Sequence, residues 1–206
     1  MKKVFLSAAI FCFLVAESQA QFRIGAKAGA NFTNITEGPT SGTLETFDNK
    51  LGVRLGLVVE KSLSSNFALQ SGLLYNQQGT YKKAINEYII LNYVELPLLF
   101  MFKPFSKFSV GAGPYLAYGI SEVSKKGTVV TTKNDFGDSF EPELFDYGFQ
   151  ALVGYEVVNN LVLGASYSMG LQNISQDKTF SRKLSGFGVS LTKFFGSKKT
   201  DNVKTK

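Results

Sequence analysis

The chain has 206 residues, a formal net charge of +6 at pH 7, no histidine and one cysteine. Without histidine, Ser/His/Asp catalysis and histidine-ligated metal sites are excluded, so we expect neither an enzyme nor a bound cofactor. The modest positive charge is not gathered into a basic cluster interleaved with aromatic residues, so nucleic acid is not an expected partner.

The first twenty residues have the three regions of a secretory signal peptide. Lys2 and Lys3 are basic, residues 4–16 are apolar, and residues 18–20 form a small-x-small cleavage site. We therefore expect cleavage after Ala20 and export of the remaining chain. Cys12 lies inside the apolar run, so the mature protein is expected to have no thiol.

From residue 22 onward, apolar residues recur at every second position. Such a period of two predicts β-strands that have one apolar face and one small or polar face. Eight segments follow this pattern, in chain order residues 22–32, 51–60, 66–78, 88–103, 107–122, 144–157, 161–171 and 183–195.

The connections between these segments alternate between long and short. Residues 34–49, 79–87, 123–143 and 172–182 form the long ones, and residues 61–65, 104–106 and 158–160 form the tight ones. This alternation is typical of barrels that cross the outer membrane with short turns on the periplasmic side. The prediction is an all-β, eight-stranded, antiparallel up-and-down transmembrane β-barrel over residues 21–195, located in the cell outer membrane.

Composition decides which face of the strands points outward. A soluble barrel would have the same period with its apolar face inside, but here many glycines lie on the polar face. Small residues suit the narrow lumen of an eight-stranded barrel. Aromatic residues lie toward both ends of the apolar face, as expected of two interfacial girdles. The expected periplasmic girdle contains Phe22, Phe67, Phe102, Phe108, Tyr155 and Phe195, and the extracellular one Phe32, Tyr75, Tyr88, Tyr118 and Phe145.

Six charged residues fall on the predicted lumen face at two depths. Lys27, Arg54 and Glu95 are expected near mid-depth, and Arg23, Glu60 and Glu156 toward the periplasmic end. Because buried charges are normally paired, we predict that these residues form packed ion pairs that fill the barrel. The alternative interpretation of the same residues is a gated, narrow pore.

The loop over residues 123–143 contains four carboxylates, and these are candidate extracellular contacts: Asp135, Asp138, Glu141 and Glu143. A calcium site is an alternative role for them, although their spacing does not match an EF-hand loop. At the other end of the protein, the basic tail over residues 196–206 is expected to be a disordered segment in the periplasm.

Four short motifs resemble the PorT-like outer-membrane barrel family of Bacteroidetes-type Gram-negative bacteria. They are GAKAGANF at 25–32, NYVELPL at 92–98, GAGPY at 111–115 and DYGFQ at 146–150. The resemblance covers nearly the whole mature chain and implies an eight-stranded barrel. The namesake of the family is associated with type IX protein secretion. One departure is at the C-terminus, where the aromatic pair Phe194-Phe195 is followed by the tail.

These observations predict a non-enzymatic, monomeric barrel surrounded by outer-membrane lipid. Its expected role is structural, or interaction through the extracellular loops. A PorT-like component of a secretion machinery, with cell-envelope proteins as partners, is the alternative, and a narrow passive pore is a third possibility.

Overall fold

The computed structural model describes residues 22–43, 45–133, 145–175 and 179–195. The expected signal peptide, the basic tail and the four loop carboxylates Asp135, Asp138, Glu141 and Glu143 lie outside these residues. In the described part of the chain, no helix is long and apolar enough to cross a membrane.

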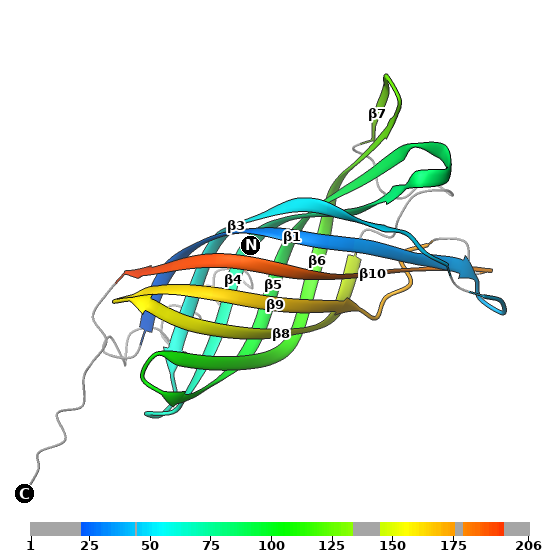
Figure 1. Cartoon of the computed structure of the whole chain (residues 1–206). Coiled ribbons are helices and arrows are strands. Elements are labelled where there is room, and N and C mark those ends of the chain that lie inside the picture. Colours follow the sequence, from blue (N-terminus) through cyan, green and yellow to red (C-terminus); the bar gives the residue numbers. More distant parts are fainter. Residues whose placement is uncertain (1–21, 44, 134–144, 176–178, 196–206) are drawn as a thin grey trace, which may run out of the picture.

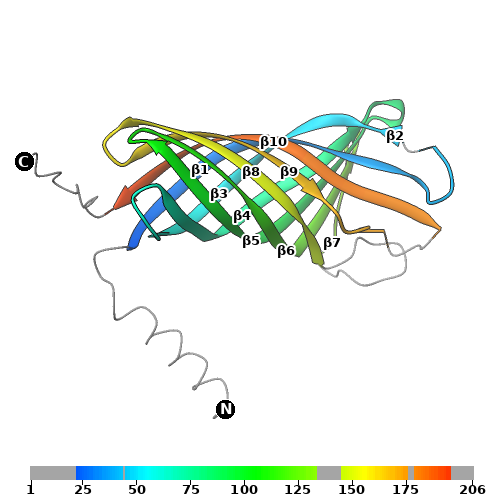
Figure 2. The same cartoon turned by 90° about the horizontal axis from the view of Figure 1, so that it is seen from below.

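Eight long antiparallel strands form a closed ring, which confirms the predicted fold (Figure 1). Short turns join the strands at one end and longer connections join them at the other (Figure 2). The ring consists of β1 (Phe22–Pro39), β3 (Asp48–Ser62), β4 (Phe67–Lys82), β5 (Glu87–Phe105), β6 (Phe108–Lys126), β8 (Phe145–Val158), β9 (Leu161–Gly170) and β10 (Phe180–Phe195). Three short elements lie outside the ring: β2 (Glu45–Thr46), β7 (Val129–Lys133) and the 3-10 helix η1 (Lys83–Ile85).

Pairing of the first strand with the last closes the barrel. β1 and β10 are in antiparallel register from Ile24 opposite Phe195 to Pro39 opposite Phe180. Closure matters because the hydrocarbon layer offers no water to a free strand edge, so every backbone N–H and C=O in it must find a partner within the sheet.

The apolar face of the strands points outward, as predicted from composition. On β3, Leu51 is 60% exposed and Leu57 is 59% exposed. On the same strand, Arg54 is only 5% exposed and Glu60 only 2%. This is the reverse of a soluble barrel, and it leaves a lipid-facing surface outside and a polar interior.

Close approach of neighbouring strands explains some of the glycines. A Cβ atom added at Gly113 would lie 1.9 Å from the carbonyl oxygen of Leu98, and one at Gly52 would lie 2.1 Å from that of Gln77. No side chain can be accommodated at such distances without moving the adjacent strand. These two glycines are therefore required by the barrel wall itself.

Several strands extend further on the extracellular side than the apolar pattern predicts, and β1 does so most, because it ends at Pro39 rather than at residue 32. The ring pair Tyr118 and Phe145, with centroids 5.3 Å apart, marks the extracellular girdle. Tyr75 on β4 and Val94 on β5 lie in the same register row as Tyr118 on β6. Beyond this row, β4, β5 and β6 continue for about seven residues, which at the usual rise and tilt is about 18 Å. The alternation of apolar and polar residues weakens there, but the hydrogen-bond ladder between the strands continues.

The described residues above the girdle belong mainly to one side of the ring. Within the described ranges, β8 begins at Phe145 and β9 ends at Gly170. Beside β8, β6 forms a hairpin with β7 that projects beyond the ring (Figure 1). The described extracellular part is a curved sheet from β10 through β1, β3, β4, β5 and β6 to β7.

Candidate functional site

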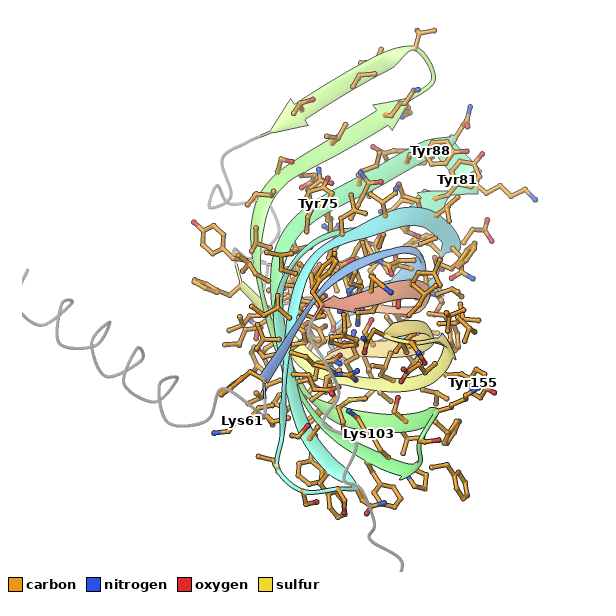
Figure 3. The ribbon with its side chains drawn as sticks, turned by 90° about the vertical axis from the view of Figure 1, so that its left-hand side faces the viewer. Lys61, Tyr75, Tyr81, Tyr88, Lys103 and Tyr155 are labelled. Atoms are coloured by element: carbon orange, nitrogen blue, oxygen red, sulfur yellow. The ribbon has the colours of Figure 1, made fainter. Side chains whose placement is uncertain are left out.

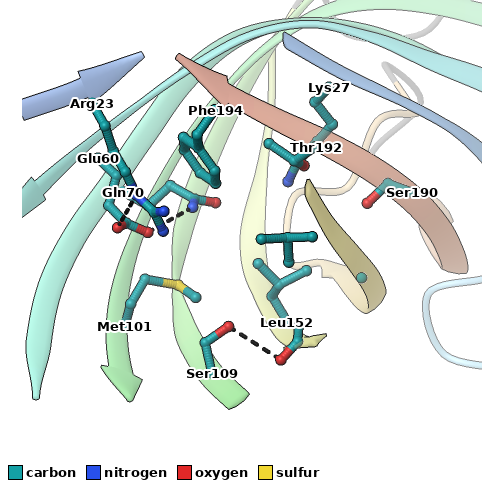
Figure 4. Close-up of a pocket in the computed structure, with 13 residues that line it drawn as sticks. Arg23, Lys27, Glu60, Gln70, Met101, Ser109, Leu152, Ser190, Thr192 and Phe194 are labelled. Carbon is teal, nitrogen blue, oxygen red and sulfur yellow. Dashed lines mark hydrogen bonds and ion pairs between the residues drawn. The ribbon is translucent and has the colours of Figure 1, made fainter. Parts of the chain in front are cut away.

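The periplasmic end of the lumen contains a cluster around the buried carboxylate of Glu60. Its Oε1 accepts a hydrogen bond from Arg23 Nε at 2.8 Å and forms an ion pair with Lys103. Its Oε2 accepts one from Gln70 Nε2 at 3.3 Å. The Arg23 guanidinium also lies 3.8 Å from the centre of the Phe194 ring (Figure 4). Both oxygens of Glu60 are therefore engaged.

A second polar network occupies the middle of the lumen. Arg54 forms an ion pair with Glu95, and its Nη2 also donates to Gln150 Oε1 at 3.2 Å. Asn76 donates to the other oxygen of Glu95 and accepts from Asn31. The five side chains come from five different strands, so this network ties together parts of the wall that are far apart in sequence.

The remaining two of the six predicted lumen charges are Lys27 and Glu156. Lys27 is buried on β1, and Arg54 repels its ammonium while Glu95 attracts it through space. Over the described ranges, no side chain forms a hydrogen bond or ion pair with Lys27. Glu156 is also buried, and its Oε1 accepts a hydrogen bond from the backbone N–H of Asn160, in the turn between β8 and β9.

Most of the side chains that bond to these charges were not among the residues predicted from the sequence. Gln70, Asn76, Lys103 and Gln150 all occupy inward-facing positions of the alternating pattern, so the period could have flagged them. It could not have indicated which of them meet, because the contacts cross between strands whose relative register the pattern does not contain.

An apolar cluster fills the lumen on the extracellular side of the middle network, which sequence analysis did not predict. It consists of Ile35, Ile89, Leu91, Tyr93, Tyr115, Ala117, Ile174 and Leu184. Tyr115 donates a hydrogen bond to Asp146 Oδ2 at 2.9 Å. Ile174 is fully buried although it belongs to the connection between β9 and β10, and its N–H bonds to the carbonyl of Arg182 at 2.9 Å. Ile174 therefore lies inside the mouth of the barrel.

Above the apolar cluster, Glu37 bridges two basic residues. It forms ion pairs with Lys82 and, at 3.0 Å, with Arg182. These side chains are only partly exposed and come from β1, β4 and β10, so they hold together the strands that extend beyond the girdle.

The outer face of the extension carries an aromatic pair. The rings of Tyr81 on β4 and Tyr88 on β5 are stacked with centroids 4.4 Å apart (Figure 3). Tyr88 pairs in register with Lys125, which pairs with Val130 of β7, so these residues form one row. Tyr88 is not level with Tyr75, although both were predicted in the extracellular girdle: it is six residues beyond Val94, the register partner of Tyr75, or about 15 Å further out.

No group of three or more acidic, histidine or cysteine side chains that could hold a metal occurs among the described residues. The four carboxylates considered for calcium are not among those residues.

Comparisons with known proteins agree with this geometry. Residues 17–176 match the family model described as "Outer membrane protein beta-barrel domain". No curated protein sequence matches the chain. The crystal structure of Neisserial surface protein A is similar with a TM-score of 0.50 and 12% identity, over 84% of this chain and 97% of that one. This similarity shows the fold alone.

Two further solved structures are similar at lower scores. The attachment invasion locus protein Ail of Yersinia pestis, crystallised with the heparin analogue sucrose octasulfate, has a TM-score of 0.48 and 10% identity, over 84% of this chain and 99% of that one. OprG of Pseudomonas aeruginosa has a TM-score of 0.39 and 10% identity, over 86% of this chain and 97% of that one.

Proposed function

Because this chain belongs to the outer membrane protein beta-barrel domain family, we propose that it is a non-enzymatic outer-membrane barrel with a closed lumen that acts through its extracellular part. The observation that carries the proposal is the extension of the sheet beyond the girdle, with exposed aromatic and apolar side chains on its outer face.

Three successive layers of side chains support a closed lumen. The Glu60 cluster lies at the periplasmic end, the Arg54–Glu95 network in the middle and the apolar cluster toward the outside. Paired charges anchored on different strands resist displacement, since removing one partner leaves the other buried and uncompensated. The side chains of an eight-stranded barrel are sufficient to fill its interior.

Two sides of the extension differ in chemistry, which supports an interaction role for one of them. On the side of β4 to β7, Tyr88 is 41% and Val130 57% exposed, beyond the level of the Tyr118–Phe145 ring pair. On the side of β10 and β1, the outer face is polar, with Lys183 exposed and Ser185 bonded to Asn34. An exposed aromatic and aliphatic patch above a membrane is typical of a contact surface for another macromolecule.

Site-specific photo-crosslinking in intact cells tests this role. A photoreactive side chain placed at Tyr88 is expected to give discrete adducts with one extracellular macromolecule. The matched control is the same side chain at Lys183, which has a similar height on the polar side of the wall. The absence of adducts at Tyr88, or equal adducts at both positions, would contradict the proposed interaction role.

A planar-bilayer measurement tests closure independently. The wild-type barrel is expected to leave the membrane silent. A steady conductance of the wild type that rises in Glu95→Ala would instead favour the narrow passive pore.

A PorT-like role in type IX secretion is the alternative proposal, and it is supported by the motif resemblance. It predicts stable protein partners. Extraction of the tagged barrel in mild detergent followed by mass spectrometry should then recover secretion proteins in stoichiometric amounts. Deletion of residues 126–140 separates the two proposals, because it should abolish surface binding but leave secretion intact if the extracellular role is correct.

A further inference from the structure

We propose that a cavity in the periplasmic half of the lumen, beside Lys27, is a binding site for a small monovalent anion such as chloride. This lumen site is separate from the proposed extracellular function and does not depend on what the extension contacts.

Lys27 is a buried cation with no counter-ion among the residues that the structure describes. Its side chain is on the lumen face of β1, and the residue is only 7% exposed. The two nearest carboxylates are already engaged: both oxygens of Glu60 and both oxygens of Glu95 accept hydrogen bonds from other side chains. A buried ammonium without a partner is strongly unfavourable, so a compensating anion or a polar solvent molecule is expected beside it.

The charge balance of the cavity wall favours an anion. Two basic side chains line the cavity, namely Arg23 and Lys27, against one carboxylate, Glu60. One positive charge is therefore in excess. In a region shielded from bulk water, the attraction of that charge for one monovalent anion is little screened.

The cavity has the size and the donors for such a ligand. Its volume of about 20 Å³ exceeds the 10–15 Å³ that one water molecule requires, which leaves room for one small ion. Lys27 and Thr192, which are register partners, both line it (Figure 4). Ser109 and Ser190 add hydroxyl groups to the wall, and Met101, Leu152 and Phe194 supply apolar surface.

A further donor points to the same place. Arg23 also lines the cavity, and its Nη1 is buried without a hydrogen-bond partner among the described residues. Two cationic groups therefore face one small space whose other polar groups are uncharged hydroxyls and the engaged Gln70 and Glu60. Such a set of donors selects a single negative charge rather than a cation.

Thermal unfolding of the full mature barrel in detergent tests the site. The unfolding temperature is the temperature at which the heat-modifiable band disappears from gels. Chloride or bromide, compared with gluconate at equal ionic strength, should raise the unfolding temperature saturably by about 3 °C. Lys27→Met should abolish this halide-specific shift, whereas the control Lys183→Met, on the outer face, should retain it.

Two wild-type measurements keep the inference falsifiable if Lys27→Met does not fold. Equal unfolding temperatures in chloride and gluconate would overturn it and leave a hydrated cavity. Crystals grown in bromide should show an anomalous peak between Lys27 and Thr192, and its absence at saturating bromide would also overturn it. Neither result affects the crosslinking experiment at Tyr88, so the two proposals fail separately.

Discussion

Replacement of Glu95 by glutamine is the sharpest test of how the barrel interior is stabilised. Glu95 is 1% exposed and receives Arg54 on one oxygen and Asn76 on the other. The Glu95→Gln variant keeps the shape of the side chain but removes its charge. Its amide can accept from Arg54 or from Asn76, but not from both, so Arg54 becomes a buried cation without a counter-ion.

The expected cost follows from the burial of the pair. Removing one partner of a buried ion pair typically costs 3–5 kcal/mol, and because glutamine retains one acceptor we expect about 3 kcal/mol. Replacing both partners by apolar residues of similar volume, in Arg54→Met with Glu95→Leu, should recover much of this loss. The control Glu87→Gln changes a carboxylate that bonds Ser124 near the extracellular end, and it should cost less than about 0.5 kcal/mol.

Urea unfolding from lipid vesicles measures these free energies. The chain contains no tryptophan, so far-UV circular dichroism is the suitable signal. If Glu95→Gln unfolds at the same urea concentration as the wild type and Glu87→Gln, the middle network contributes nothing to stability. The reasoning from buried charge would then be refuted.

Two further substitutions test the wall and the apolar cluster. Gly113→Val should prevent folding, because even a Cβ atom there would lie 1.9 Å from a carbonyl oxygen. The heat-modifiable band on gels should then be lost. The control Gly127→Asn should fold normally, because Gly127 has a φ of 57° and open space around it. Ile174→Asp should lower the free energy of unfolding by about 3 kcal/mol because it buries a charge among apolar side chains, whereas Ile174→Val should cost about 1 kcal/mol. A urea midpoint for Ile174→Asp equal to that of Ile174→Val would show that the connection between β9 and β10 does not plug the mouth.

The strands that cross the membrane were predictable because lipid imposes a strict local pattern. A residue such as Leu57 must face the hydrocarbon and its neighbours must not, so the period of two is visible in the sequence alone. The same constraint ends at the girdle. The sequence pattern therefore stopped at residue 32 in the first strand, whereas β1 continues to Pro39 on hydrogen bonds that polar residues make equally well.

The sequence by itself determined the eight strands, their outward apolar face and the inward position of the charges. Only the tertiary structure decided which charges meet: Arg54 pairs with Glu95, 41 residues away, while Lys27 on the neighbouring strand forms no ion pair with any described carboxylate. It also decided that Ile174 turns inward and that Tyr88 lies about 15 Å beyond the level of Tyr75. The physical reason is that the alternating pattern within one strand decides whether a side chain faces inward or outward. Which inward-facing side chains meet depends instead on the stagger of all eight strands around the ring.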